Sequence, residues 1–448
     1  MPRLPPAEGA RRRGLFAVAI YLATTAVYFA FAAPATLREH TPWNHYALQA
    51  SAWLQGRLDL GGPPPPYAGN NDFSEFEGKW FVPFPPLPAL LLVPAVALAG
   101  SPEAVVDGRF FLFLAGVAPA ALFLALEKLR ARGRAERSER DSVLLALLFA
   151  FGSVYFFSAE QGTVWFAAHV VGTGLAALYL WVALEAERPF TAGLLLGLAF
   201  AARTPLLFAA PLFVLELARR ALPADDAGPW SFETLAALAA RLDRRRFARG
   251  LARFSLPVAG VLALTLWHDA ARFGDPFEVG YRYLTVAWHA RIEKWGLFSY
   301  HYLARNLGVV LTSLPWLGAG GDYGRAFRID GHGLALWVTT PMYLWALWPK
   351  SKRAPHLALA LTTGAVALPT LFYQNTGWLQ FGYRFSNDYA VFLFALLYVG
   401  GRRFGALFCA VAAWAVAINA FGALTFGRDA GANVYVIEGS QRVLYEPD

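Results

Sequence analysis

Long apolar stretches recur along most of the chain, and they limit its fold more than any other feature. About 20 apolar residues span the hydrocarbon core of a bilayer. Stretches that reach or approach this length occupy residues 14–34, 105–127, 142–158, 164–185, 189–203, 204–218, 252–270, 332–349, 355–373, 388–400 and 404–426. We therefore expect an all-α polytopic membrane protein with about eleven transmembrane helices, folded as one integral membrane domain over residues 1–448.

Basic residues gather between alternate apolar stretches and predict the topology. They cluster at residues 11–13, 128–140, 219–253, 350–353 and 402–403. Cytoplasmic loops are enriched in Lys and Arg, so we place these clusters and the N-terminus in the cytoplasm and the C-terminus outside. The segment 219–251 is then a cytoplasmic loop, and 35–104 and 271–331 are outer (periplasmic) loops.

The short apolar run at 85–100 is predicted to stay on the outer side. If it crossed the membrane, the arginine-rich loop at 128–140 would face outwards. A run of 10 to 16 apolar residues is more often an interfacial helix than a span. We expect outer-face juxtamembrane helices here and at 302–317.

Composition excludes several other classes of protein. The 39 Lys and Arg exceed the 31 Asp and Glu, but they lie in short runs between apolar stretches, where the membrane charge bias explains them without a nucleic-acid partner. The single cysteine, Cys409, rules out an intrachain disulfide and a thiolate metal cluster. The eight histidines show no metal-binding spacing. We expect no cofactor; carboxylates could hold a divalent metal, but no pattern indicates one.

The first outer loop carries a resemblance to a known superfamily. It contains NHYALQASAWLQGRLDL and FEGKWFVPFPPLPALLL, and GRFFLFLAGVAPAALFL and GLLLGLAFAARTPLLFAAPLF follow. This order resembles the GT-C membrane glycosyltransferases, especially the aminoarabinose and protein mannosyltransferase branch. FGDPFEVGYRY, GLFSYHYLARNL and QFGYRFSND resemble a bacterial subgroup of uncharacterised membrane proteins placed with them. The resemblance implies a GT-C-like bundle in a bacterial cytoplasmic (inner) membrane.

The resemblance also implies an activity. These enzymes move a sugar from a polyprenyl-phosphate donor to a lipid, glycan or protein acceptor at the outer face of the membrane. This chain departs from their pattern, because Pro42 and Trp43 replace an Asp-Glu pair and Phe84 replaces a lysine. The family's catalytic residues are therefore not transferable. The chemistry still needs a base for the acceptor hydroxyl and cations for the leaving phosphate.

Candidate bases lie near the predicted outer face: Glu39, His45, Asp72 and Glu160. Glu39 could instead cap the first helix beside Arg38. Asp72 follows turn-forming residues, and His45 could pack beneath tryptophans. Glu160 lies in a short turn between two apolar stretches, where an acid is costly unless it is paired or used.

Arg384 is the leading candidate for phosphate binding. It lies among aromatic residues that include Trp378 and Tyr383; a guanidinium fits phosphate, and aromatic faces suit sugars and prenyl chains. The alternative is an interface anchor paired with Asp388, four residues on. The secondary candidates are Arg109, Arg203, Arg282 and Arg305. Snorkelling to the interface also explains Arg109 and Arg203.

Two other functions remain open. One is an O-antigen-ligase-like transferase of a completed glycan, which would use the loop at 271–331. The other is a multi-pass transporter or lipid flippase. That reading predicts repeated halves and charges buried in the membrane, and the sequence shows neither an internal repeat nor a buried row of charges.

Overall fold

The computed structural model describes residues 6–69, 72–223, 237, 239–286, 288–317, 327–352, 354–431 and 434–436. Within these ranges, five helices are long and apolar enough to cross a membrane. They are Glu8–Phe31 in α1 (Pro6–Phe31), Asp107–Ala131 across α5 (Asp107–Ala115) and α6 (Val117–Ala131), Val164–Ala186 in α9 (Val164–Ala183) and η2 (Leu184–Ala186), α13 (Arg244–Phe273) and α19 (Ala406–Thr425). The helical membrane-protein class is confirmed, while about eleven crossings stay a prediction.

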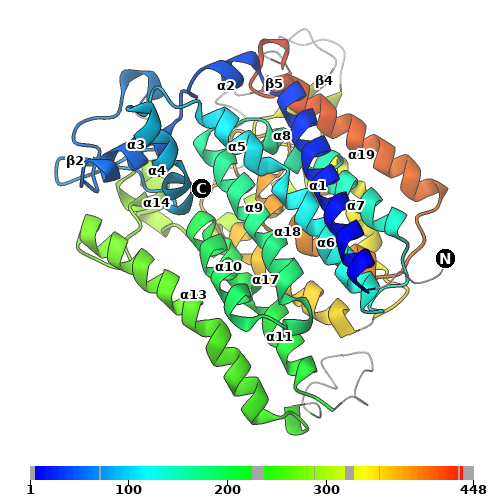
Figure 1. The fold of residues 1–448 in the computed structure, drawn as a ribbon. Helices are drawn as coiled ribbons and strands as arrows, with labels where there is room; N and C mark the ends of the chain where they lie inside the picture. The colour runs from blue at the N-terminus through cyan, green and yellow to red at the C-terminus, as the bar shows by residue number, and fades with distance from the viewer. Residues whose placement is uncertain are drawn as a thin grey trace.

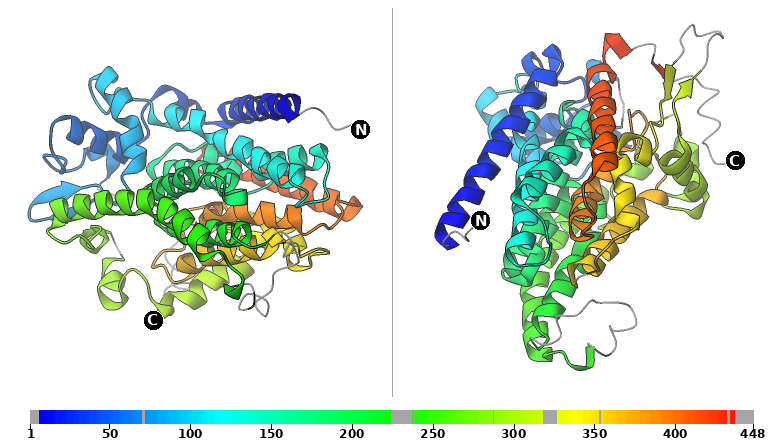
Figure 2. Two further views of the ribbon diagram at one scale, coloured as in Figure 1. Left: turned by 60° about the horizontal axis from the view of Figure 1, so that its bottom comes forward. Right: turned by 90° about the vertical axis from the view of Figure 1, so that its right-hand side faces the viewer.

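Shorter helices complete the bundle (Figure 1). They are α7 (Glu139–Phe151), α8 (Tyr155–Ala159), α10 (Pro189–Ala202), η3 (Thr204–Ala209), α11 (Ala210–Arg220), α17 (Ala354–Leu371) and α18 (Asn387–Val399). Helix α9 is central, because 83% of its most apolar 18-residue segment is buried. The corresponding segments of α1 and α13 are 28% and 17% buried, and these helices lie at the periphery (Figure 2). The exposed leucines of α13, such as Leu256 and Leu264, suit contact with lipid chains.

The predicted first outer loop forms a layer beside α9 and α10. It contains α2 (Pro34–Arg38), α3 (His45–Leu54), η1 (Pro66–Ala68), the antiparallel strands β1 (Ser74–Phe76) and β2 (Lys79–Phe81), and α4 (Leu87–Ala99). Helix α4 packs on α3 and also touches α9 and α10. It leaves Leu90 and Leu98 57% and 91% exposed, as an interfacial helix would.

The second predicted outer loop holds η5 (Tyr281–Tyr283), α14 (His289–Trp295), η6 (Tyr300–Tyr302), α15 (Leu303–Thr312), β3 (Trp316–Leu317) and β4 (Phe327–Asp330). Strand β4 pairs antiparallel with β3 and parallel with β5 (Tyr435–Val436), which follows η9 (Asp429–Gly431). Helix α15 takes the place of the juxtamembrane helix expected at 302–317. This pairing brings the segment after α19 onto the loop.

Three expected helices are broken. The stretch 332–349 forms only α16 (Leu336–Thr339) and the 3₁₀ turns of η7 (Pro341–Leu347). Pro341 follows directly after the break, and proline lacks the N–H that a continuing helix needs. The stretch 142–158 divides into α7 and α8 at Gly152, and 204–218 into η3 and α11. Parts of the predicted loops, 70–71, 224–236, 238, 287 and 318–326, and the C-terminal 437–448, lie outside the described residues.

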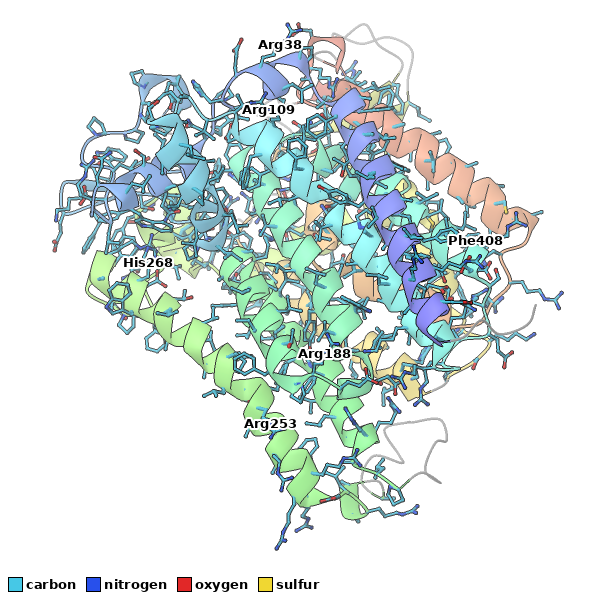
Figure 3. The ribbon with its side chains drawn as sticks, viewed as in Figure 1. Arg38, Arg109, Arg188, Arg253, His268 and Phe408 are labelled. Carbon is cyan, nitrogen blue, oxygen red and sulfur yellow. The ribbon has the colours of Figure 1, made fainter. Side chains whose placement is uncertain are left out.

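Basic residues collect at one end of the bundle. Arg219 donates to Glu216 and Glu185 at 2.8 and 2.9 Å. Lys128 donates to the carbonyl of Leu184 at 2.6 Å. In Figure 3, Arg188 and Arg253 lie towards this end, and His268, near the end of α13, lies away from it. The opposite end of the same helices therefore holds the first residues of α9 and α18.

Candidate functional site

A large cavity of about 1330 Å³ lies at the end of the bundle away from these basic residues. Its wall is formed by residues before α3 and α4, the start of α9, the turn after α10, the end of α13, the loop before α18 and the segment after α19. Most of the wall is apolar or aromatic, and the charged members are Asp72, Glu160, Arg203, Asp269, Arg272, Arg384, Arg428 and Asp429. We call this space the site cavity.

Arg384 is a buried cation on the wall of the site cavity. Arg384 is 5% exposed. Among the described residues, no carboxylate oxygen lies within 4.0 Å of its guanidinium. The group lies 5.1 Å from the ring centroid of Phe166 and 5.7 Å from that of Phe385. Its Nε makes no hydrogen bond within the described part of the chain. Burial, and then the like charge of Arg203, lowers the pKa of Arg384 to about 9, which leaves it cationic at neutral pH.

Gln380 fixes the backbone position of Arg384. Its Oε1 accepts from the Arg384 N–H at 2.9 Å, and its Nε2 donates to the carbonyls of His332 and Thr376 at 2.7 and 2.8 Å. Gln380 is fully buried. The loop before α18 thus holds Arg384 at the cavity through a satisfied amide, which favours a single backbone conformation.

Arg203 lies next to Arg384 but is neutralised. Its guanidinium gives two hydrogen bonds to Asp388, at 2.9 and 2.6 Å, and lies 5.4 Å from the same Phe385 ring that Arg384 contacts. The sequence-based alternative of an Arg384–Asp388 pair is therefore wrong. Residues 384–386 form the 3₁₀ turn η8 ahead of α18, so the i,i+4 spacing of an α-helix does not apply there.

Asp72 provides a carboxylate on the same cavity wall as Arg384. Its Oδ2 accepts from the indole N–H of Trp165 at 2.7 Å, and the charge of Arg384 acts on it. Burial outweighs both effects and raises the pKa of Asp72 above its usual value. The residue has a φ of 59°, a conformation that costs energy outside glycine and is concentrated at functional sites.

Glu160 and Arg428 form a second hydrogen-bonded pair. Glu160 is 1% exposed and accepts from Arg428 at 2.8 Å and from Gln161 at 2.6 Å. Burial exceeds the opposing effect of Arg428 and raises the pKa of Glu160 to about 8. Arg428 also donates to the carbonyl of Phe31. This pair ties the segment after α19 to α1 and to the turn before α9.

Asp269 and Arg272 form a third pair, at the end of α13. Their side chains meet at 2.5 Å, and Arg272 donates to the carbonyl of Val82 at 2.8 Å. The pair thus attaches the first outer loop to α13. No buried row of charges is evident in the sequence, but the structure contains three buried or part-buried pairs of an arginine and an acidic side chain at one cavity. An apolar environment makes such charges costly unless they are paired or used.

The remaining candidates from the sequence lie apart from the cavity wall. Glu39, Arg109 and Arg282 are exposed, and none of them is among the described residues that form the wall. Figure 3 shows Arg109 on the first turn of α5. His45 and Tyr383 are fully buried instead. His45 stacks on Phe73 at 4.0 Å, and the hydroxyl of Tyr383 bonds Thr370 at 3.0 Å.

These placements put several of the expected residues away from the cavity wall, and local structure explains two of them. Asn44 precedes the first residue of α3 and begins a helix that turns His45 inwards onto an aromatic layer. Arg305 also points inwards and donates to the carbonyl of Gln374. Trp378, by contrast, lies on the cavity wall as expected. So do Asp72, Glu160, Arg203 and Arg384.

Several side chains of the site, His169 and Arg428 among them, were not selected from the sequence. His169 lies inside an apolar stretch, where a single histidine is usually a packing residue. Arg428 follows the last apolar stretch, and only the return of the chain past Phe31 brings it to Glu160. The acid in the SND sequence, Asp388, was seen only as a partner for Arg384. The contact between a buried histidine and an acid on a neighbouring helix depends on the tertiary structure, and a local sequence pattern does not predict it.

A metal site is not evident. In the described part of the chain, no group of three or more His, Cys, Asp or Glu side chains is placed to hold a metal ion. The arrangement instead places the guanidinium of Arg384 and the carboxylate of Asp72 on one cavity wall, and no carboxylate of the described residues pairs with that guanidinium. It suits binding of an anionic group next to a proton acceptor.

The comparisons with known proteins concern the fold. No protein-family model matches the chain, and no curated protein matches its sequence. A crystal structure of the apo oligosaccharyltransferase of Archaeoglobus fulgidus matches 91% of this chain at 12% identity, with a TM-score of 0.53. The chain shares the fold of this enzyme. It spans 56% of the length of that protein.

Other structures of the same archaeal protein match less closely. One, in complex with an inhibitory peptide and a dolichol-phosphate, has a TM-score of 0.48, 12% identity and coverage of 91% of this chain and 56% of the other. The likeness to the apo enzyme supports the helical fold expected from the sequence, and membership of the GT-C superfamily stays a prediction, as does the branch within it.

Proposed function

We propose that this protein is a GT-C glycosyltransferase that transfers a sugar from a polyprenyl-phosphate donor to a lipid, glycan or protein acceptor. The observation that carries the proposal is Arg384, a buried guanidinium that has no carboxylate partner among the described residues, on the wall of a cavity of about 1330 Å³. A buried charge without a partner is costly. An anionic ligand removes that cost and explains why the charge is kept.

The charges of the site cavity favour a donor with one phosphate. Each of the other wall arginines is hydrogen-bonded to an acidic side chain: Arg203 to Asp388, Arg272 to Asp269 and Arg428 to Glu160. Arg384 is left, among the described residues, to meet the single negative charge of a phosphodiester. A diphosphate-linked glycan, which the ligase alternative would use, brings a second charge with no unpaired wall arginine to meet it.

The proposed reaction is one sugar transfer with Asp72 as the base. Asp72 takes the proton from the acceptor hydroxyl, and the hydroxyl oxygen forms a bond to the anomeric carbon of the sugar. The bond from that carbon to the phosphate oxygen breaks, and the oxygen keeps the electron pair. The lipid phosphate thereby gains a second negative charge, which Arg384 stabilises by charge-assisted hydrogen bonds.

The proposed location follows from charge. The end of the bundle with Lys128 and Arg219 faces the cytoplasm under the positive-inside rule. The N-terminus is then cytoplasmic, and the site cavity opens at the outer face of the bacterial inner membrane, with about eleven crossings between. Lipids of this membrane supply the donor.

A transfer assay tests the proposal. The purified protein is incubated in liposomes with radiolabelled polyprenyl-phosphate sugars and membrane lipid, glycan or peptide acceptors. We expect transfer from at least one such donor and loss of transfer in Arg384→Ala. Absence of transfer, together with absence of any binding of farnesyl phosphate to the wild-type protein, would overturn the assignment.

A further inference from the structure

His169 is a buried polar residue for which the proposed reaction has no role. It lies on α9, is fully buried and lies on the wall of the site cavity. Its Nδ1 lies 3.4 Å from Oδ1 of Asp388. Neither ring nitrogen makes a hydrogen bond within the described part of the chain. A buried polar group left unsatisfied costs about 1–3 kcal/mol, so such a group in a cavity wall indicates a missing ligand or water.

The same aromatic ring links His169 to the arginines. The ring centroids of His169 and Phe385 lie 6.0 Å apart, and the guanidiniums of Arg203 and Arg384 lie 5.4 and 5.7 Å from the Phe385 ring. The Nε of Arg384 and the imidazole of His169 make no hydrogen bond within the described residues, and both groups lie near the ring of Phe385. A single ligand beside Phe385 would reach both.

The charges around His169 come from three neighbouring elements. Asp388 belongs to α18, Arg203 to the turn after α10 and Arg384 to η8, and all three act on the imidazole. Asp388 already accepts both hydrogen bonds of Arg203. When Nδ1–H is directed at Asp388, Nε2 is left without a protein partner. In the imidazolium form, Nε2 carries a second N–H, which would donate to a phosphate oxygen.

We propose that His169 contacts the departing lipid phosphate and takes up one proton when that phosphate binds. This inference rests on the proposed function. The donor is a phosphodiester with one negative charge, and the product is a phosphomonoester with two. Asp72 takes the hydroxyl proton, and His169 takes a proton from solvent. The positive charge of the imidazolium then balances the added negative charge of the phosphate. His169 thereby distinguishes the product from the donor by charge.

Titration calorimetry of the full-length protein in detergent tests whether a proton is taken up when the phosphate binds. Farnesyl phosphate is mostly a dianion at pH 7.5, because its second ionisation lies near pH 6. Binding is measured in buffers that differ in ionisation enthalpy. For the wild type, the heat should report uptake of about one proton per phosphate bound. His169→Gln should bind about tenfold more weakly and take up none.

Matched controls separate folding from function. Methyl farnesyl phosphate is a phosphodiester with one charge, and we expect the wild type and His169→Gln to bind it equally, without proton uptake. This result would show that the variant is folded. Glu160→Gln and Asp72→Asn should still take up a proton when farnesyl phosphate binds. This result would exclude Glu160 and Asp72 as the groups that take up the proton.

Two outcomes contradict different parts of the account. If His169→Gln keeps both the affinity and the proton uptake of the wild type, His169 has no part in phosphate binding and the inference fails. If the wild type binds neither farnesyl phosphate nor its methyl ester, the proposed function fails as well.

Discussion

Asp388 accepts two hydrogen bonds from Arg203, at 2.9 and 2.6 Å, and the neighbouring Arg384 has no carboxylate partner in the part of the chain that the structure describes. Both guanidiniums lie over the ring of Phe385. The like charge of Arg203 acts against that of Arg384, and of these two guanidiniums the paired aspartate bonds only that of Arg203. An anionic ligand at Arg384 would neutralise the remaining positive charge.

The Arg203–Asp388 pair is predicted to hold the fold. Asp388→Asn should destabilise the protein by about 3–5 kcal/mol, because it leaves the charge of Arg203 in the interior without a counter-charge. The double variant Arg203→Met with Asp388→Leu should recover most of that loss, since it removes both charges. Thermal unfolding in detergent measures the effect. Equal stability of Asp388→Asn and the wild type would contradict a structural role for the pair.

Arg384 is predicted to contribute most to binding of the donor phosphate. Arg384→Ala should weaken binding of farnesyl phosphate by about 10- to 100-fold, as expected for loss of hydrogen bonds to a charged group. Arg384→Lys should fall between the two, because lysine keeps the charge and loses the planar fork. The exposed Arg282 provides a matched control. Arg282→Ala should bind like the wild type, and an equal loss in both alanine variants would argue for a diffuse surface charge.

Asp72 is predicted to be the base of the transfer reaction. Asp72→Asn should lower kcat by about 10²- to 10⁴-fold and leave the affinity for farnesyl phosphate nearly unchanged. The base acts only when deprotonated. Because burial raises the pKa of Asp72, wild-type kcat should rise with pH over a range above that of an ordinary aspartate. An activity profile that is flat with pH, or a variant that keeps its kcat, would assign the base elsewhere.

Glu160 is predicted to make stability depend on pH. Its pKa is raised to about 8 in the folded protein, against an unfolded value of about 4.3. The folded state therefore binds more protons between these values, and stability should fall as the pH rises through this window. Glu160→Gln should remove this part of the dependence. The measurement is the unfolding temperature of both proteins from pH 5 to pH 8.5, and parallel curves would contradict the prediction.

Hydropathy and charge predicted the parts of the fold that depend on single segments. Helices α1, α9 and α19 follow from apolar runs, and α4 follows from the charge of the loop after α6. The break between α16 and η7 was not predicted, because hydropathy does not register the hydrogen bond that Pro341 cannot donate. A count of crossings drawn from hydropathy shares this weakness.

The site was predicted in part for a similar reason. Glu160 was selected because an acid between two apolar stretches is costly, Asp72 because it lies near the predicted outer face, and Arg384 because it lies among aromatic residues. All three lie on the cavity wall. The partners of these charges depend on contacts between distant segments. Arg428 reaches Glu160 over a sequence separation of 268 residues, and no local pattern encodes such a contact.

The position of the phosphate in a complex tests the central claim most directly. A cryo-electron microscopy structure of the protein with polyprenyl phosphate would show it. The account predicts phosphate density within hydrogen-bonding distance of the Arg384 guanidinium, next to His169 and Asp72. Density for the phosphate at another place on the protein, with the Arg384 guanidinium still unpaired, would contradict it.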